Sequence, residues 1–147
     1  MRTKAEHGGA EVGRTEISTG TAFETLGNYC RAKRVGPFVF VAGTTAIDER
    51  GDVYAAGNTY DQSIYVFERI RSVLQEMGAG IEHVVRTRAY LADIALGAEE
   101  YLRAHGEVFR DVRPVATGVE AKLITPGMMV EIEVDALICD SRGNPVY

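Results

Sequence analysis

The segment from residue 130 to residue 136 alternates strictly between apolar and acidic side chains. Successive side chains of a β-strand point to opposite faces, so an extended chain here carries one oily face and one charged face. The apolar face consists of Val130, Ile132, Val134 and Ala136, and the acidic face of Glu131, Glu133 and Asp135. Such a strand favours a sheet that is packed on one side and left uncovered by its own chain on the other.

Two segments have the period of amphipathic helices and would cover the oily side. In the first, apolar residues recur at steps of three and four: Ile64, Phe67, Ile70, Val73, Leu74 and Met77. Thr59 and Gln62 have capping-box spacing at its start, and Gly78 suits the left-handed residue after its end. The second stripe consists of Ala98, Tyr101, Leu102, His105, Val108 and Phe109.

Five segments are expected to be strands. Residues 29–35 and 38–42 form a hairpin around Gly36-Pro37, residues 84–91 follow the first helix, and residues 115–123 and 128–138 flank a turn at 125–127. The order strand, strand, helix, strand, helix, strand, strand predicts an α+β two-layer sandwich with both helices on one face.

A chain of 147 residues fits a single domain. Residues 1–14 have no periodic apolar pattern, so we expect a flexible N-terminal arm over 1–20, one domain over 21–140 and a C-terminal tail over 141–147.

The charge and the apolar runs of the sequence argue against two classes of partner, nucleic acids and membranes. The net charge is −5, and Lys and Arg form no cluster, which argues against a nucleic-acid partner. No apolar run reaches the ~20 residues that span a bilayer, so we expect a cytoplasmic protein without a membrane partner.

Cys30 and Cys139 form no CxxC pair and are expected to be free thiols. His7, His83 and His105 lack metal-ligand spacing, so no metal or cofactor is predicted.

Five motifs in a particular order resemble one family. They are the segment Gly36-Pro37-Phe38-Val39-Phe40-Val41-Ala42-Gly43, the capped helix of 58–77, the strand of 84–93, Arg113-Pro114, and Val130-Glu131-Ile132-Glu133-Val134. Over residues 26–138 the chain resembles the Rid family, also called YjgF-type or L-PSP-type proteins. The resemblance implies a chorismate-mutase-like fold, a homotrimer with pockets at its interfaces, and hydrolysis of reactive enamines or imines without a cofactor.

The resemblance also identifies a departure. In the imine deaminases of the family, an arginine on the strand after Pro114 holds the substrate carboxylate, and the matching position here is Ala116. Losing that charge-assisted contact would weaken binding by about 1.5–3 kcal/mol. Either the substrate differs or another cation replaces the arginine.

Four arginines could supply that cation. Arg88 could serve, or with Arg86 it could neutralise the acidic row of the last strand. Arg103 could serve, or it could be a solvated helix residue. Arg31 and Arg34 are expected to be surface charges.

Three further residues match positions of the family pocket, and a fourth, Thr117, lies beside the position of the lost arginine. Glu131 matches the glutamate that activates the hydrolytic water, with interface electrostatics as the alternative role. Tyr29 would close over a planar ligand, or simply pack at a strand end. The Gly43 backbone would face the ligand, and Thr117 would offer it a hydroxyl unless it is an ordinary strand residue.

The leading hypothesis is therefore a trimeric hydrolase that acts on a C–N or C=N bond of a small, planar, anionic enamine or imine. The alternative is a non-catalytic trimer that binds a metabolite and has lost deaminase activity. RNA cleavage, a name attached to parts of the family, is disfavoured because the chain is acidic and has no basic groove.

Overall fold

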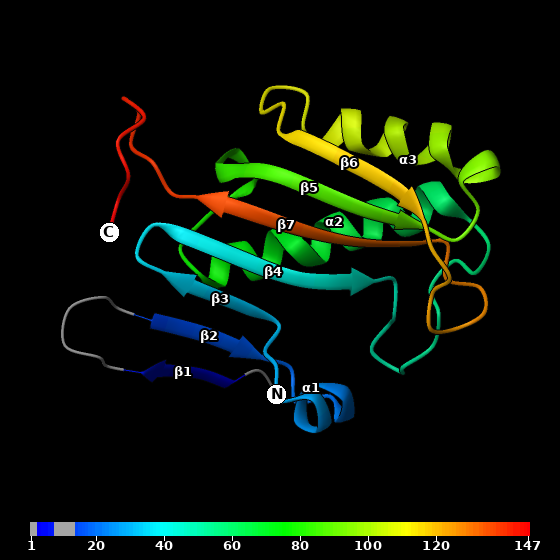
Figure 1. The fold of residues 1–147 in the computed structure, drawn as a ribbon, viewed down its shortest axis with the longest axis horizontal. Coiled ribbons are helices and arrows are strands. Elements are labelled where there is room, and N and C mark those ends of the chain that lie inside the picture. Colours follow the sequence, from blue (N-terminus) through cyan, green and yellow to red (C-terminus); the bar gives the residue numbers. More distant parts are fainter. Residues whose placement is uncertain (1–2, 8–13) are drawn as a thin grey trace.

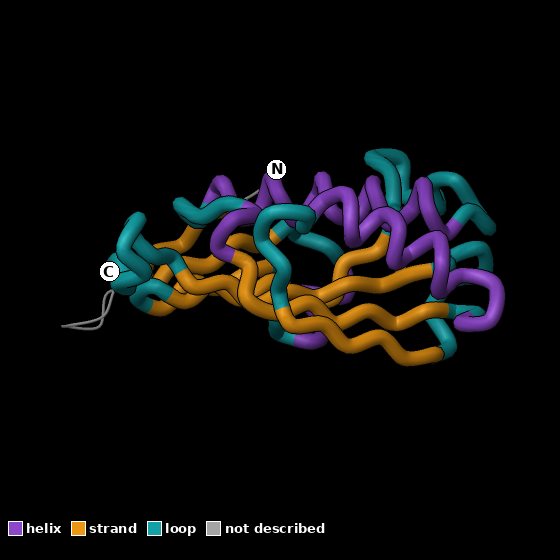
Figure 2. Tube along the Cα trace, turned by 90° about the horizontal axis from the view of Figure 1, so that it is seen from above, coloured by secondary structure: helices purple, strands orange, loops and turns teal. Residues whose placement is uncertain are grey.

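The protein is built on one sheet whose two long helices lie on a single face (Figures 1 and 2). The computed structural model describes residues 3–7 and 14–147. Its strands are β1 (Thr3–His7), β2 (Arg14–Ser18), β3 (Ala32–Val35), β4 (Phe38–Thr45), β5 (Val84–Leu91), β6 (Val115–Glu120) and β7 (Val130–Leu137). Its helices are α1 (Ala22–Gly27), α2 (Thr59–Glu76), α3 (Ile94–Val108) and a short 3-10 turn at Ile81–His83.

The sheet has seven strands in the order β1-β2-β3-β4-β7-β5-β6. All neighbours are antiparallel except β5 and β6, which are parallel because α3 connects them as a crossover. The predicted α+β two-layer sandwich, mostly antiparallel with two helices on one face, is confirmed. Short helix α1 was not predicted. No helix within the described residues is long and apolar enough to cross a membrane.

Two strands that the apolar pattern did not reveal extend the sheet at one edge. β1 pairs with β2, and β2 pairs with β3 from Arg14 opposite Val35 to Ile17 opposite Ala32. Ile17 is 1% exposed. Residues 14–18 therefore belong to the sheet, although the sequence analysis assigned them to a flexible arm. One buried side chain in five residues was too little signal. Residues 1–2 and 8–13 lie outside the described part, and the other domain boundaries stay predictions.

The N-cap of the long helix α2 lies one residue earlier than predicted. Asn58 is the N-cap, and its side-chain Oδ1 accepts a hydrogen bond from the Asp61 backbone N–H at 2.9 Å. Gln62, predicted to complete a capping box, is instead fully buried and donates to Gly127 O at 2.8 Å. At the other end Gly78 has φ +80°, as its predicted place after the helix requires.

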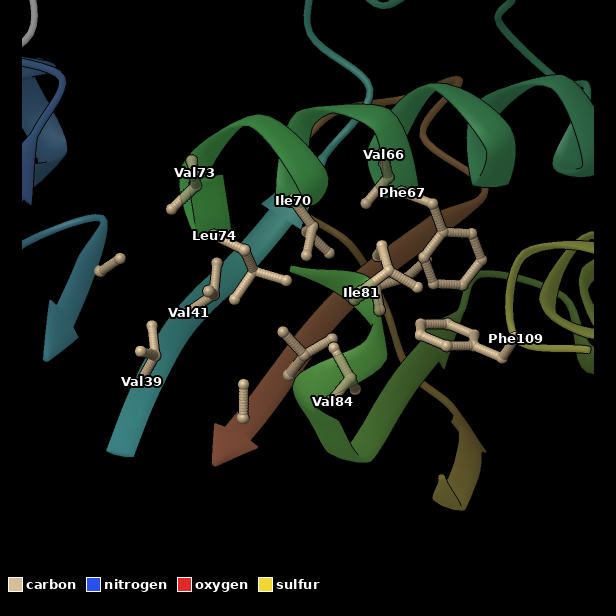
Figure 3. Close-up of a cluster of buried hydrophobic side chains, with 14 of the residues drawn as sticks. Val39, Val41, Val66, Phe67, Ile70, Val73, Leu74, Ile81, Val84 and Phe109 are labelled. Carbon is tan, nitrogen blue, oxygen red and sulfur yellow. The ribbon is translucent and has the colours of Figure 1, made fainter. Parts of the chain in front are cut away.

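The core lies between the sheet and the two long helices (Figure 3). α2 contributes Val66, Phe67, Ile70 and Leu74, each 0% exposed, and these pack on the inward residues of β4, β5 and β7. Along β7 the inward residues are buried and the acidic ones half-buried, so the predicted alternation is confirmed. Because the inward residues are held in this core, the alternate residues of the same strands point to the other face of the sheet.

The core gives a direct stability test. We expect Leu74→Ala, at 0% exposure, to lower the free energy of unfolding by about 2–5 kcal/mol because it leaves a cavity. Leu102→Ala on α3, where Leu102 is 63% exposed, should cost less than about 0.5 kcal/mol. Urea denaturation at one protein concentration measures both, and equal costs would contradict the assigned core.

Candidate functional site

The acidic row of β7 lies on the sheet face away from α2 and α3, which we call the open face. Arg88 Nη1 lies 3.4 Å from Glu133 Oε1 and 3.2 Å from Asp135 Oδ2, and Arg86 Nε lies 3.9 Å from Asp135 Oδ2. The Tyr90 hydroxyl donates to Glu133 at 3.2 Å. The arginines of β5 thus neutralise two of the three carboxylates, which was the alternative predicted for Arg88.

Glu131 stands apart from this network. It is half-buried, and among the described residues no arginine forms a direct ion pair with it. Burial raises the pKa of the Glu131 carboxyl above its ordinary value, the Arg31 charge partly opposes that rise, and the Glu133 charge adds to it. A carboxyl with a raised pKa is suited to accepting a proton from water and returning it.

A β-bulge brings backbone close to this carboxyl. Val41 pairs with Val134 and Thr44 with Ile132, so Ala42 and Gly43 together oppose the single residue Glu133. A Cβ at Gly43 would collide with the Glu131 carboxylate. Glycine permits this close approach, and it is not used for a special backbone angle, because its φ lies outside the left-handed region.

Arg31 lies on the other side of the same bulge. Its guanidinium Nη2 donates to Gly43 O at 2.8 Å, and its Nε is buried without a hydrogen-bond partner in the described chain. Arg31 is therefore not the surface charge that the sequence analysis expected. Arg34 is not one either, since it donates to Gly36 O and, at 2.9 Å, to Met77 O at the end of α2. In the sequence, Arg31 directly precedes the strand residue Ala32, whose side chain is buried against the helices. The alternation of a strand therefore places Arg31 on the open face, and this was the available signal.

An open cleft of about 820 Å³ lies next to these residues. Its lining includes Tyr29 and Arg88, two predicted site residues, together with side chains from α1, β2 and β3. The Tyr29 ring packs beside Gly27 and is 48% exposed. Lys33 and Glu16, also in the lining, pair at 3.6 Å. The cleft carries both signs of charge.

The remaining candidates for chemistry, His105 and the two cysteines, show no arrangement that indicates a reactive or metal-binding role in the described chain. His105 is packed among Phe67, Tyr101 and Phe109, and its Nε2 lies 2.9 Å from Thr87 Oγ1, as predicted for a packed histidine. Burial lowers its pKa. Both cysteines are free, and no cluster of three metal-ligating side chains occurs within residues 3–7 and 14–147.

Comparison with known proteins identifies the family. The model of the family described as Endoribonuclease L-PSP matches residues 19–138. The chain belongs to the Rid family, the L-PSP or YjgF-type proteins. A crystal structure of a YjgF-family protein from Mycobacterium tuberculosis is 40% identical, with a TM-score of 0.74 over 85% of this chain and 99% of that one.

Two curated relatives span most of this Rid-family chain. An uncharacterized protein of Streptomyces coelicolor is 37% identical over 122 residues, which cover 82% of this chain and 89% of the relative. The 3-aminoacrylate deaminase RutC of Acinetobacter baylyi is 28% identical over 107 residues, which cover 73% and 84%.

Ala116, the position that the sequence analysis matches to the deaminase arginine, lies away from Glu131 within one chain. Ala116 pairs with Thr87, and Thr87 is buried against α3 on the helix side of the sheet. Thr117 pairs with Arg88 and so shares the open face with the acidic row. Positions 116 and 131 therefore lie on opposite faces of the same sheet.

Arg103 does not join the predicted site within one subunit. Its guanidinium lies 3.8 Å from the centroid of the Tyr60 ring, which belongs to α2. Both residues belong to the helical layer, on the other side of the sheet from Glu131. Of the predicted residues, Glu131, Arg88 and Thr117 share the open face, and Gly43 approaches Glu131 there. Tyr29 and Arg88 line the open cleft, whereas Glu131, Gly43 and Thr117 do not belong to its lining.

The contact between Gly43 and Glu131 can be tested by a double-mutant cycle. We expect Gly43→Ala to lower the free energy of unfolding by about 1–3 kcal/mol because the new methyl displaces the carboxylate. In a Glu131→Ala background the same change should cost less than about 0.5 kcal/mol, since the colliding group is gone.

The control is Gly106→Ala, in the last turn of α3, where a Cβ meets nothing within 4 Å. It should stabilise by about 0.5–1 kcal/mol because alanine replaces glycine within a helix. Chemical denaturation reads out all five proteins, and an undiminished cost of Gly43→Ala without Glu131 would contradict the contact.

Proposed function

We propose that this Rid-family chain hydrolyses the C–N bond of a small enamine or imine, with Glu131 as the general base. The observation that carries the proposal is a half-buried carboxyl of raised pKa, held against backbone at the Gly43 bulge and left out of the arginine network that neutralises its neighbours. The name of the relative RutC supports the reaction class, since 3-aminoacrylate is an enamine.

The proposed reaction is the addition of water across C=N. Glu131 accepts a proton as the water oxygen bonds to the imine carbon, and it returns that proton to the nitrogen to give a carbinolamine. The C–N bond then breaks as the hydroxyl proton passes to the nitrogen through Glu131, so that ammonia leaves and a carbonyl remains. An enamine would first take up a proton at carbon to give the imine. Ionised Glu131 is needed for the first step and protonated Glu131 for the second.

We infer that the pocket is completed at the interface of a homotrimer. β6 is an edge strand, and all six of its residues are exposed. Phe38 and Phe40 stack on the open face with 49% and 45% of their surfaces exposed. Exposed aromatic surface of this kind favours a partner. Because Ala116 and Glu131 lie on opposite faces of the sheet, a site that used both positions would take them from different copies.

A second function has one observation in its favour. Position 116 is Ala in this chain, and a pocket without the usual arginine fits a trimer that binds a metabolite without hydrolysing it. A protein with no turnover on any imine would support this alternative.

The general-base role predicts a large loss on Glu131→Gln. We expect kcat to fall about 10²–10⁴-fold, with Glu99→Gln, an exposed carboxylate of α3, as the matched control. Ammonia and keto-acid release from freshly generated imines measures the rate. A wild-type rate in Glu131→Gln would exclude the assigned role.

The pH profile tests the same residue independently. Only the ionised carboxylate accepts a proton, so kcat/KM should fall as the pH drops through a pKa above the ordinary glutamate range. The descending acid limb should be missing from the residual activity of Glu131→Gln. An acid limb that survives the substitution would assign that pKa to another group.

The interface predicts a change of assembly on Phe40→Glu. Phe40 pairs across from Asp135, so a carboxylate there adds like charge to the open face and removes apolar contact. We expect light scattering at micromolar concentration to show trimers for the wild type and for Leu102→Glu, on α3, and smaller species for Phe40→Glu. A monomeric wild type would contradict the interfacial pocket.

A further inference from the structure

The backbone of Arg31 is held between two strands, so the start of its side chain is well positioned. Its N–H donates to Ile17 O at 2.7 Å, and its carbonyl accepts from the Ala42 N–H at 3.0 Å. These bonds join the residue just before β3 both to β2 and to the bulge of β4. The guanidinium therefore emerges beside Gly43 from a fixed base.

The guanidinium of Arg31 is only partly satisfied by its own chain. Nη2 donates to Gly43 O at 2.8 Å, while Nε is buried without an acceptor among the described residues. Buried donors normally find acceptors. A carboxylate is the ligand best matched to a guanidinium, because two parallel N–H groups meet two oxygens.

Unlike the arginines on β5, Arg31 forms no direct ion pair with a carboxylate within the described chain. Arg86 and Arg88 pair directly with Glu133 and Asp135. Arg31 is close enough to Glu131 to oppose the rise of its pKa, but no direct ion pair joins the two within the described chain. Both groups approach Gly43, Arg31 at the carbonyl oxygen and Glu131 at the position that a Cβ would fill, and the neighbouring residues Ala42 and Glu133 line the open cleft.

We propose that Arg31 binds the carboxylate of the substrate and replaces the arginine that is absent at Ala116. This inference rests on the proposed function and narrows its substrate class to enamines and imines with a carboxylate next to the reacting carbon. Arg31 and Glu131 both approach Gly43, so the carboxylate and the reacting carbon of such a substrate would lie close together in one small molecule. The competing role for Arg31 is a brace that only holds the bulge through Gly43 O.

Ligand binding separates the two roles without any need for turnover. Pyruvate is an inert 2-oxo acid, and pyruvamide has nearly the same shape without the charge. We expect Arg31→Gln to weaken pyruvate binding about 10- to 100-fold, the range for a lost hydrogen bond to a charged group. Pyruvamide binding should change by less than about 3-fold, since Gln keeps an amide donor for Gly43 O. Calorimetry or NMR titration measures both ligands.

Two further variants complete the design. Arg71→Gln removes an arginine paired with Glu68 on α2 and should leave pyruvate affinity unchanged. Arg31→Gln combined with Ala116→Arg should recover part of the affinity, because the cation returns at the position used by other family members. Light scattering on each variant keeps the assembly state comparable.

The outcomes are distinct. Equal weakening of both ligands by Arg31→Gln would establish the brace and overturn the proposal, and unchanged pyruvate affinity would overturn it as well. A wild type that binds no pyruvate would reject the carboxylate substrate class. If pyruvate binding depends on Arg31 but no imine is hydrolysed, the inference stands and the proposed hydrolase activity fails.

Discussion

The structure depends on burying one face of its sheet and only one. α2 and α3 cover the inward residues of β4, β5 and β7, so each residue on these strands faces either a dry core or the open side. That division explains why Glu131, Glu133 and Asp135 can share a strand with fully buried Ile132 and Val134. It also leaves the open face to be satisfied by ion pairs, by ligand or by another copy.

On that open face, strand pairing and a single bulge make one carboxyl different from its neighbours. On β5 the residue opposite Glu131 is Tyr90, whereas Glu133 and Asp135 lie opposite Arg88 and Arg86. On β4 the extra residue at Ala42-Gly43 presents the backbone of Gly43 to Glu131 and a carbonyl to Arg31. Because Glu131 is partly removed from solvent, its pKa is raised above that of an exposed carboxylate.

The sequence predicted what depends on periodicity and missed what depends on contacts between distant segments. The alternation of β7 and the apolar stripe of α2 each repeat one pattern over several residues, so a single atypical residue does not hide the element. The Gly36-Pro37 turn lies between two such runs. β2 has one buried side chain, Ile17, and gave no such repeat. Arg31 was misjudged because its environment is made by Gly43 and Glu131, which lie 12 and 100 residues further along the chain.

The placement of the cation also bears on what assembly contributes. Position 116 faces the helix side on an edge strand, so an arginine there can approach Glu131 only in another subunit. Arg31 and Glu131 belong to one chain and flank one glycine. With the charge at Arg31, a neighbouring subunit would shape and dry the pocket instead of supplying its cation. Exclusion of water strengthens both the carboxylate contact and the shift at Glu131, so assembly would still govern the chemistry, through solvation instead of through charge.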